Sequence, residues 1–94
     1  MKIPKEIRIG GITFQVKRNC SFDDDREGDL DWDKSTIRIK KGLSYDAEWL
    51  TFLHELQHGI DFVYMNGKVK EQFGEDGIDV LGNGWYQVIQ QLGD

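Results

Sequence analysis

The chain has 94 residues, 12 of them basic and 17 acidic, and therefore a formal net charge of −5. This length predicts a single domain over residues 1–94. A hydrophobic content of 38%, including 12% aromatic residues, is enough for a folded core and argues against disorder. The acidic balance argues against a direct nucleic-acid partner, because contacts to backbone phosphates need a basic surface.

The single cysteine and the lack of long apolar runs indicate the cellular compartment of the protein. Cys20 is the one cysteine, so no internal disulfide can form and a reducing compartment fits best. No apolar stretch follows the basic residues at the start of the chain, as a signal peptide would require. No run approaches the roughly 18 apolar residues of a membrane span. We expect a cytoplasmic protein with no membrane partner.

Two β-hairpins are predicted in the first half of the chain. Residues 6–17 alternate apolar and polar side chains on either side of Gly10-Gly11, a dipeptide typical of a hairpin turn. Residues 19–29 form a polar loop whose consecutive aspartates lack the alternating spacing of a calcium-binding loop. Residues 29–42 alternate again around a turn at residues 33–35.

A long helix follows, from Tyr45 to about Met65. Ser44 is suited to cap its start, and Asn66-Gly67 is a typical stop. Apolar residues recur along it at three- and four-residue spacing and form a core stripe: Trp49, Leu53, Leu56, Ile60 and Val63.

A second helix is predicted from about Glu75 to Gln91, after the polar segment 68–72. We expect Gly82 to let this helix pack closely on the first, near Gly59. Together the elements predict an α+β fold, in which antiparallel hairpins of three to four strands pack on the first helix and a second helix ends the domain. The predicted apolar face of the second helix comprises Ile78, Leu81, Trp85, Val88, Ile89 and Leu92.

The only two histidines stand four residues apart in the first predicted helix, in His54-Glu55-Leu56-Gln57-His58. That spacing stacks both imidazoles on one face of a helix. H-E-x-x-H is the motif of a zinc site in which the histidines are ligands and the glutamate, here Glu55, is the general base. Chance placement would create it in roughly 0.1% of chains of this composition. Two histidines that happen to border the core are the alternative.

A catalytic zinc site usually has three protein ligands. Since the chain has no other histidine, the third must be a carboxylate or Cys20. Asp79, Asn83 and Tyr86 recur at i, i+4 and i+7 on the second predicted helix and form a polar stripe. We predict Asp79 as the third ligand, with Glu75, one turn earlier, as the reserve. A stripe that is merely solvated is the alternative.

Asp61 follows His58 by three residues and leans the same way in a helix. We predict that it accepts a hydrogen bond from an imidazole N–H and so fixes the tautomer of a ligand. A salt-bridging surface carboxylate is the alternative. The expected cofactor is one Zn²⁺ per chain, although two imidazoles and a carboxylate also suit Mn²⁺, Fe²⁺ and Co²⁺.

Three stretches of the chain, IPKEIRIGGITFQV, TFLHELQHGID and DVLGNGWYQVIQQ, resemble the ImmA/IrrE-type metallopeptidases, especially their minimal phage and mobile-element members. The resemblance spans nearly the whole chain and implies a small zincin-like fold. The family has a Glu-x-x-Ala-Asn element on its second helix, whose acid is the third zinc ligand. This chain has Asp79-Val80-Leu81-Gly82-Asn83 there, so the metal would have to lie nearer the second helix, as closer packing through Gly82 would allow.

The resemblance implies cleavage of an intracellular regulatory protein, such as a phage or mobile-element repressor, in a bacterium or a phage-infected host. The residues alone predict a zinc hydrolase, in which Glu55 takes a proton from the attacking water and passes it to the leaving amine. We expect an extended substrate to pair with a free sheet edge at Ile37–Lys40. Tyr86 or Tyr64 is a candidate at the oxyanion, with a core or rim tyrosine as the alternative.

The competing function is a catalytically weak or inactive zincin-derived module. Such a protein would hold a metal for stability and act by binding a regulatory protein. The small size of the chain and the Asp79 substitution favour this alternative. The oligomeric state is not predicted.

Overall fold

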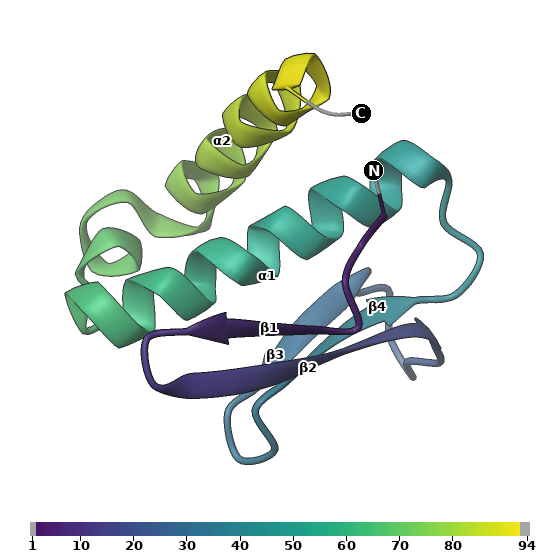
Figure 1. Cartoon of the computed structure of the whole chain (residues 1–94), viewed down its shortest axis with the longest axis horizontal. Coiled ribbons are helices and arrows are strands. Elements are labelled where there is room, and N and C mark those ends of the chain that lie inside the picture. Colours follow the sequence, from purple (N-terminus) through teal and green to yellow (C-terminus); the bar gives the residue numbers. More distant parts are fainter. Residues whose placement is uncertain (1, 93–94) are drawn as a thin grey trace.

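The computed structural model describes residues 2–92, which form an α+β fold with a four-stranded mixed sheet and two helices (Figure 1). Its elements are β1 (Glu6–Ile9), β2 (Ile12–Cys20), β3 (Gly28–Asp31), β4 (Thr36–Lys40), α1 (Tyr45–Met65) and α2 (Lys68–Leu92). α1 packs on the sheet, and α2 packs on α1 without contacting a strand. The predicted α+β class is confirmed. In the described part of the chain, neither helix combines the length and apolar character that crossing a membrane requires.

The strands are arranged in the order β1-β2-β4-β3. β1 pairs with β2, and β3 with β4, in antiparallel fashion. Parallel pairing of β2 with β4 joins the two halves, a pairing that the prediction of antiparallel hairpins did not address. β4 has a neighbour on each side, and the free edges belong to β1 and β3. The prediction that a substrate pairs with a free edge at Ile37–Lys40 is therefore wrong.

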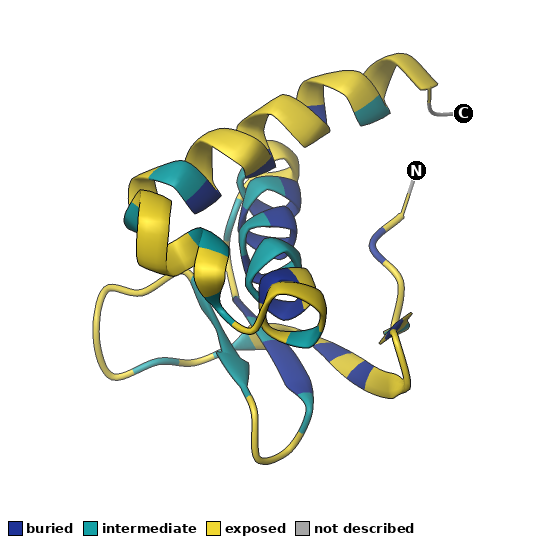
Figure 2. Cartoon of the chain, turned by 90° about the vertical axis from the view of Figure 1, so that its left-hand side faces the viewer, coloured by how far each residue is buried: buried dark blue, intermediate teal, exposed yellow. Residues whose placement is uncertain are grey.

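The core explains why β4 takes an inner position. Ile37 and Ile39 of β4 are fully buried, as is Phe14 of β2. Side chains this apolar are shielded best where a strand has neighbours on both sides and a helix above it. The side of α1 that faces the sheet is buried over most of the helix (Figure 2) and supplies Trp49, Phe52 and Leu53 to the core.

Both ends of α1 match the prediction because local capping residues define them. The Ser44 side chain accepts a hydrogen bond from the backbone N–H of Ala47 at 3.1 Å, which satisfies one free donor of the first turn. Asn66 adopts a left-handed conformation with φ of 54°, and its N–H donates to the carbonyl oxygen of Asp61, as is typical of a helix C-terminus.

α2 begins earlier than predicted and is interrupted. The polar segment 68–72 is helical, and it meets the rest of α2 at Gly74, where φ is 67° and ψ is −172°. Essentially only glycine adopts this backbone conformation without strain. The break falls directly before Glu75, so the predicted helix start marks the second segment of α2.

The buried face of α2 is narrower than predicted. Ile78, Gly82 and Tyr86 are buried at four-residue spacing, and Ile89 is partly buried against the core. The other predicted members of this face are 45–79% exposed, so their assignment to the packed side is wrong: Leu81, Trp85, Val88 and Leu92. α2 has only α1 beneath it, and contact with a single helix covers one narrow stripe.

The two helices approach each other closely at Gly82. A Cβ atom at Gly82 would lie 3.5 Å from the backbone nitrogen of His54. The expected close packing is thus present, but it meets His54 instead of Gly59. A Cβ at Gly59 would instead lie 2.9 Å from Cδ1 of Ile9 in β1, so Gly59 allows α1 to approach the sheet.

Replacing Gly82 by leucine is expected to lower the free energy of unfolding by about 1–3 kcal/mol, because the new side chain would push α2 away from α1. Gly84→Leu is the matched control, since a Cβ there meets nothing within 4 Å. The control should leave stability unchanged or raise it by up to about 1 kcal/mol, because leucine favours helix more than glycine does. Urea unfolding followed by circular dichroism measures both, and equal effects would contradict the packing role of Gly82.

Candidate metal centre

α1 presents the two histidines to α2. His54 and His58 lie one turn apart, with ring centroids separated by 4.9 Å. Both side chains are mostly covered, with 20% and 16% of their area exposed. The four-residue spacing places them in one row on the helix, and the ends of that helix are set by local caps.

Glu75 of α2 meets both histidines. Its Oε1 atom lies 2.9 Å from Nε2 of His54 and 3.1 Å from Nε2 of His58. Among the described residues, these three form the one group of metal-ligating side chains whose ligand atoms all lie within 4.8 Å of one another. Partial burial acts to raise the pKa of Glu75, but the hydrogen bonds and charges of His58 and His54 together outweigh it and lower the pKa below its usual value. The carboxylate that lies beside both imidazoles is thus that of Glu75, which the sequence suggested as the second choice for the third ligand.

Asp79, predicted as the third ligand, lies on the other side of the ring of His54. Its Oδ1 atom is 3.3 Å from Nδ1 of His54, and 68% of its side chain is exposed. It does not belong to the group formed by Glu75 and the two Nε2 atoms. Because the break at Gly74 brings Glu75 over the histidine row, Asp79 falls one turn too far along α2 to reach both rings. In this position it can orient His54 by accepting its Nδ1–H.

The donor set fits a divalent cation. A neutral imidazole carries one N–H, yet His54 faces a carboxylate oxygen at each ring nitrogen. A metal ion between Nε2 and Glu75 would leave the single N–H for Asp79. Ligands of tetrahedral zinc lie about 3.3 Å apart, close to the separations of 2.9 and 3.1 Å between Glu75 and the two Nε2 atoms. Two imidazoles and one carboxylate are a set that zinc accepts.

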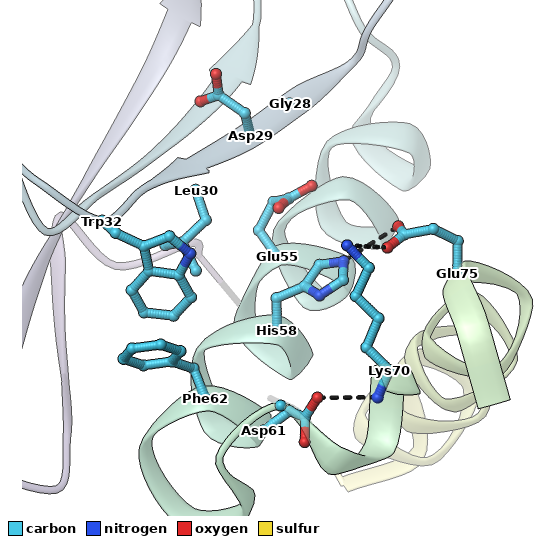
Figure 3. Close-up of a pocket in the computed structure, with 11 residues that line it drawn as sticks. Gly28, Asp29, Leu30, Trp32, Glu55, His58, Asp61, Phe62, Lys70 and Glu75 are labelled. Carbon is cyan, nitrogen blue, oxygen red and sulfur yellow. Dashed lines mark hydrogen bonds and ion pairs between the residues drawn. The ribbon is translucent and has the colours of Figure 1, made fainter. Parts of the chain in front are cut away.

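Glu55 lies beside this group on the side that faces β3. It is buried, with 9% of its surface exposed, and Figure 3 shows its carboxylate between His58 and the strand. Burial is the largest influence on its acidity and, with the nearby charge of Glu75, raises the pKa of Glu55 to about 7, although His54 opposes the shift. A carboxyl group with such a pKa can both accept and return a proton near neutral pH.

A groove passes over Glu55 between β3 and α2. It consists of two cavities of about 460 and 430 Å³, and both are lined by Gly28, Glu55 and Glu75. His58 lines the first cavity, whereas His54, Asp79 and Asn83 line the second. An extended chain in this groove would therefore pass directly over the group of Glu75 and the two histidines.

One wall of the groove is the free edge of β3. A Cβ at Gly28 would lie 2.5 Å from Cγ2 of Thr51 and 2.7 Å from the carbonyl oxygen of Arg38, so only glycine lets β3 lie this close to α1. The N–H of Lys40 donates to the carbonyl of Glu27 at 2.8 Å. Since bonded and non-bonded pairs alternate in an antiparallel ladder, the backbone groups of Gly28 and Leu30 face the open edge.

Asp61 has a different role from the one predicted. Its buried carboxylate accepts hydrogen bonds from the backbone N–H groups of Val69 and Lys70, at 2.9 and 3.0 Å. It therefore caps the start of α2, and no imidazole N–H bonds to it. Lys70 extends from this turn into the groove, where its Nζ lies 3.4 Å from Oε2 of Glu75 (Figure 3). The sequence carries no local signal for Lys70, because its position depends on the turn between the helices.

The remaining predicted residues fall into two groups. Asn83 is exposed and lines the second cavity. Tyr86 is buried away from the site: its ring stacks on Trp49, and its hydroxyl donates to Asp46, a contact that raises the pKa of Tyr86 to about 12. These contacts agree with the alternative of a core tyrosine, and Tyr86 lines neither cavity of the groove. Tyr64 and Cys20 line neither cavity of the groove.

Comparison of the chain with protein-family models, with curated proteins and with solved structures found no match in any of the three.

Glu75→Gln and Asp79→Asn are matched substitutions that separate the two carboxylates. We expect wild-type protein to bind one Zn²⁺, and Glu75→Gln to weaken binding by about a hundredfold or more, because an amide is a poorer ligand than a carboxylate. Asp79→Asn should weaken Zn²⁺ binding about tenfold, as is usual when the hydrogen-bond partner of a ligand is lost. Competition with a zinc-chelating dye measures both affinities. A larger loss of affinity in Asp79→Asn than in Glu75→Gln would show that Asp79 is the third ligand.

Asp61→Ala should destabilise the protein by about 1–2 kcal/mol, because two N–H groups at the start of α2 lose their acceptor. The exposed loop residue Asp23 provides the control Asp23→Ala, which should change stability by less than about 0.5 kcal/mol. Chemical denaturation of the metal-free proteins makes the comparison. A stable Asp61→Ala variant with undiminished helix content would refute the capping role.

Proposed function

We propose that the protein is a zinc-dependent peptidase in which His54, His58 and Glu75 hold the metal. One observation carries the proposal: Nε2 atoms of two histidines and a carboxylate oxygen converge beside the buried Glu55, on the floor of a groove with a free strand edge as its wall. Each part has a use in peptide hydrolysis, and the parts lie within one groove.

The chemistry divides between the metal and the chain. A zinc ion bound at this site supplies a Lewis acid that polarises a carbonyl group and acidifies water. Glu55 accepts a proton from the attacking water and returns it to the amide nitrogen as the peptide bond breaks. Its burial beside the groove suits both transfers, because burial favours the protonated form of a carboxyl group. Asp79, whose Oδ1 lies 3.3 Å from Nδ1 of His54, would accept the Nδ1–H once Nε2 of His54 is a ligand.

The substrate binds as an extended strand along β3. The outward backbone groups of Gly28 and Leu30 pair with it, as in other cases of strand addition at a sheet edge. This places the scissile bond over Glu55, because Gly28 and Glu55 line both cavities. Lys70, the one cation that lines either cavity, balances the charge of Glu75. The sequence resemblance adds the expectation that the natural substrate is a regulatory protein such as a repressor.

A second candidate has its own supporting observation. Glu75 bonds both imidazoles directly and so links α2 to α1. A metal there would strengthen that link, as in a small binding module whose site serves stability alone. Such a protein would bind a regulatory partner without cleaving it.

Glu55→Gln separates the two candidates. The variant should still bind one Zn²⁺, because Glu55 is not among the three metal-holding residues, yet lose about a hundredfold to ten-thousandfold in kcat/KM through the missing proton transfer. Cleavage of a mixture of synthetic peptides, read by mass spectrometry, measures activity. Equal cleavage by the two proteins would refute the role of Glu55. If neither protein cleaves and both bind zinc, the binding module is favoured.

A further inference from the structure

The two cavities of the groove differ in chemistry. On the His58 side, Trp32 and Phe62 contribute aromatic surface, and the acidic residues of this cavity are accompanied by Lys70. On the His54 side, the lining consists mainly of polar and acidic residues, including Glu27 and Asp79, and contains no lysine or arginine. A chain that crosses the site therefore meets aromatic surface on one side of the scissile bond only, and on the other side it meets carboxylates with no lysine or arginine beside them.

The apolar surface is formed by two aromatic rings in contact. Trp32 and Phe62 have ring centroids 4.0 Å apart, with planes inclined by 35°. Phe14, which is fully buried, supports Trp32 edge-on at 5.9 Å. The pair is thus anchored to the core, although Trp32 is 40% and Phe62 50% exposed. We call this pair the aromatic platform.

The position of the platform links it to the site. Trp32 follows β3 directly, two residues after Leu30, and Phe62 follows His58 by one turn of α1. Figure 3 shows both rings in the same cavity as His58 and Glu55. A strand that pairs with β3 advances about 3.3 Å per residue and turns every second side chain to the same face. One side chain near the scissile bond would therefore lie over the platform.

Burial of the platform by a ligand is favourable. Its exposed ring area is in contact with water in the free protein, and covering it with an apolar side chain would release that water. Aromatic partners add favourable ring contacts. On the opposite side, the carboxylates of Glu27 and Asp79 would repel an acidic residue of the substrate.

We propose that the groove selects an extended peptide with a large apolar side chain, aromatic, leucine or methionine, on the platform side of the scissile bond, and with a neutral or basic residue on the other side. This inference rests on the proposed function, since it describes the substrate of the same site. It assigns Trp32 and Phe62 as specificity-determining residues.

The test uses protein purified without chelators and a mixture of 14-residue peptides in which all residue pairs occur. We expect large apolar residues to be enriched at least tenfold on one side of the cleaved bonds and acidic residues to be depleted on the other. Phe62→Ser should remove most of the apolar enrichment, whereas Phe62→Leu should keep it. Phe73→Ser is the control, because Phe73 is also exposed and lines neither cavity. Cleavage without this enrichment, or enrichment unchanged in folded Phe62→Ser, would overturn the inference.

A peptide-binding experiment tests the role of the aromatic platform separately from the peptidase proposal. Immobilised Glu55→Gln protein retains peptides from the same mixture, and mass spectrometry identifies them. If no peptide is cleaved by wild-type protein but apolar peptides are retained, and Phe62→Ser abolishes that retention, the platform is supported and the peptidase proposal fails. Retention that ignores apolar residues, or that Phe62→Ser leaves unchanged, overturns the platform.

Discussion

The approach of α2 to α1 at Gly82 is the constraint on which the candidate site depends. Two of the three converging side chains belong to α1, and the third belongs to α2. Glu75 reaches both histidines only because the missing side chain at Gly82 lets the helix axes come close beside His54. A larger residue at this crossing would separate the helices and move the carboxylate away from the imidazoles.

Two further features direct α2 once it is close. The carboxylate of Asp61, buried at the end of α1, holds the N–H groups of Val69 and Lys70 and so positions the first turn of α2. Gly74 then changes the direction of the chain immediately before Glu75. The location of one oxygen atom is thus determined by a packing contact, a helix cap and a glycine conformation at three separate points. Several independent constraints of this kind can hold a set of ligands in position in the absence of the metal.

The sheet contributes the opposite wall of the groove. Gly28 allows β3 to lie against α1 with its edge open beside Glu55. On the outer side of the sheet, Asp29 of β3 pairs with Arg38 of β4, and this pair keeps the pKa of Asp29 below its usual value. The edge strand is therefore tied to its neighbour while its other side stays available. Burial of Glu55 follows from the same close packing, because the strand above it excludes water and raises its pKa.

The sequence by itself determined what depends on neighbours within about one helical turn. α1 begins after Ser44 and ends before Asn66, as predicted, because both caps act on adjacent backbone groups. The placement of His54 and His58 on one face of α1 follows from the same local geometry. The tertiary structure decided the order of the strands, the narrow buried face of α2, the capping role of Asp61 and the choice of Glu75 over Asp79 beside the imidazoles. Each of these depends on how close two distant segments approach and at what angle. Local periodicity carries no information on those quantities, because they arise from packing across the whole domain.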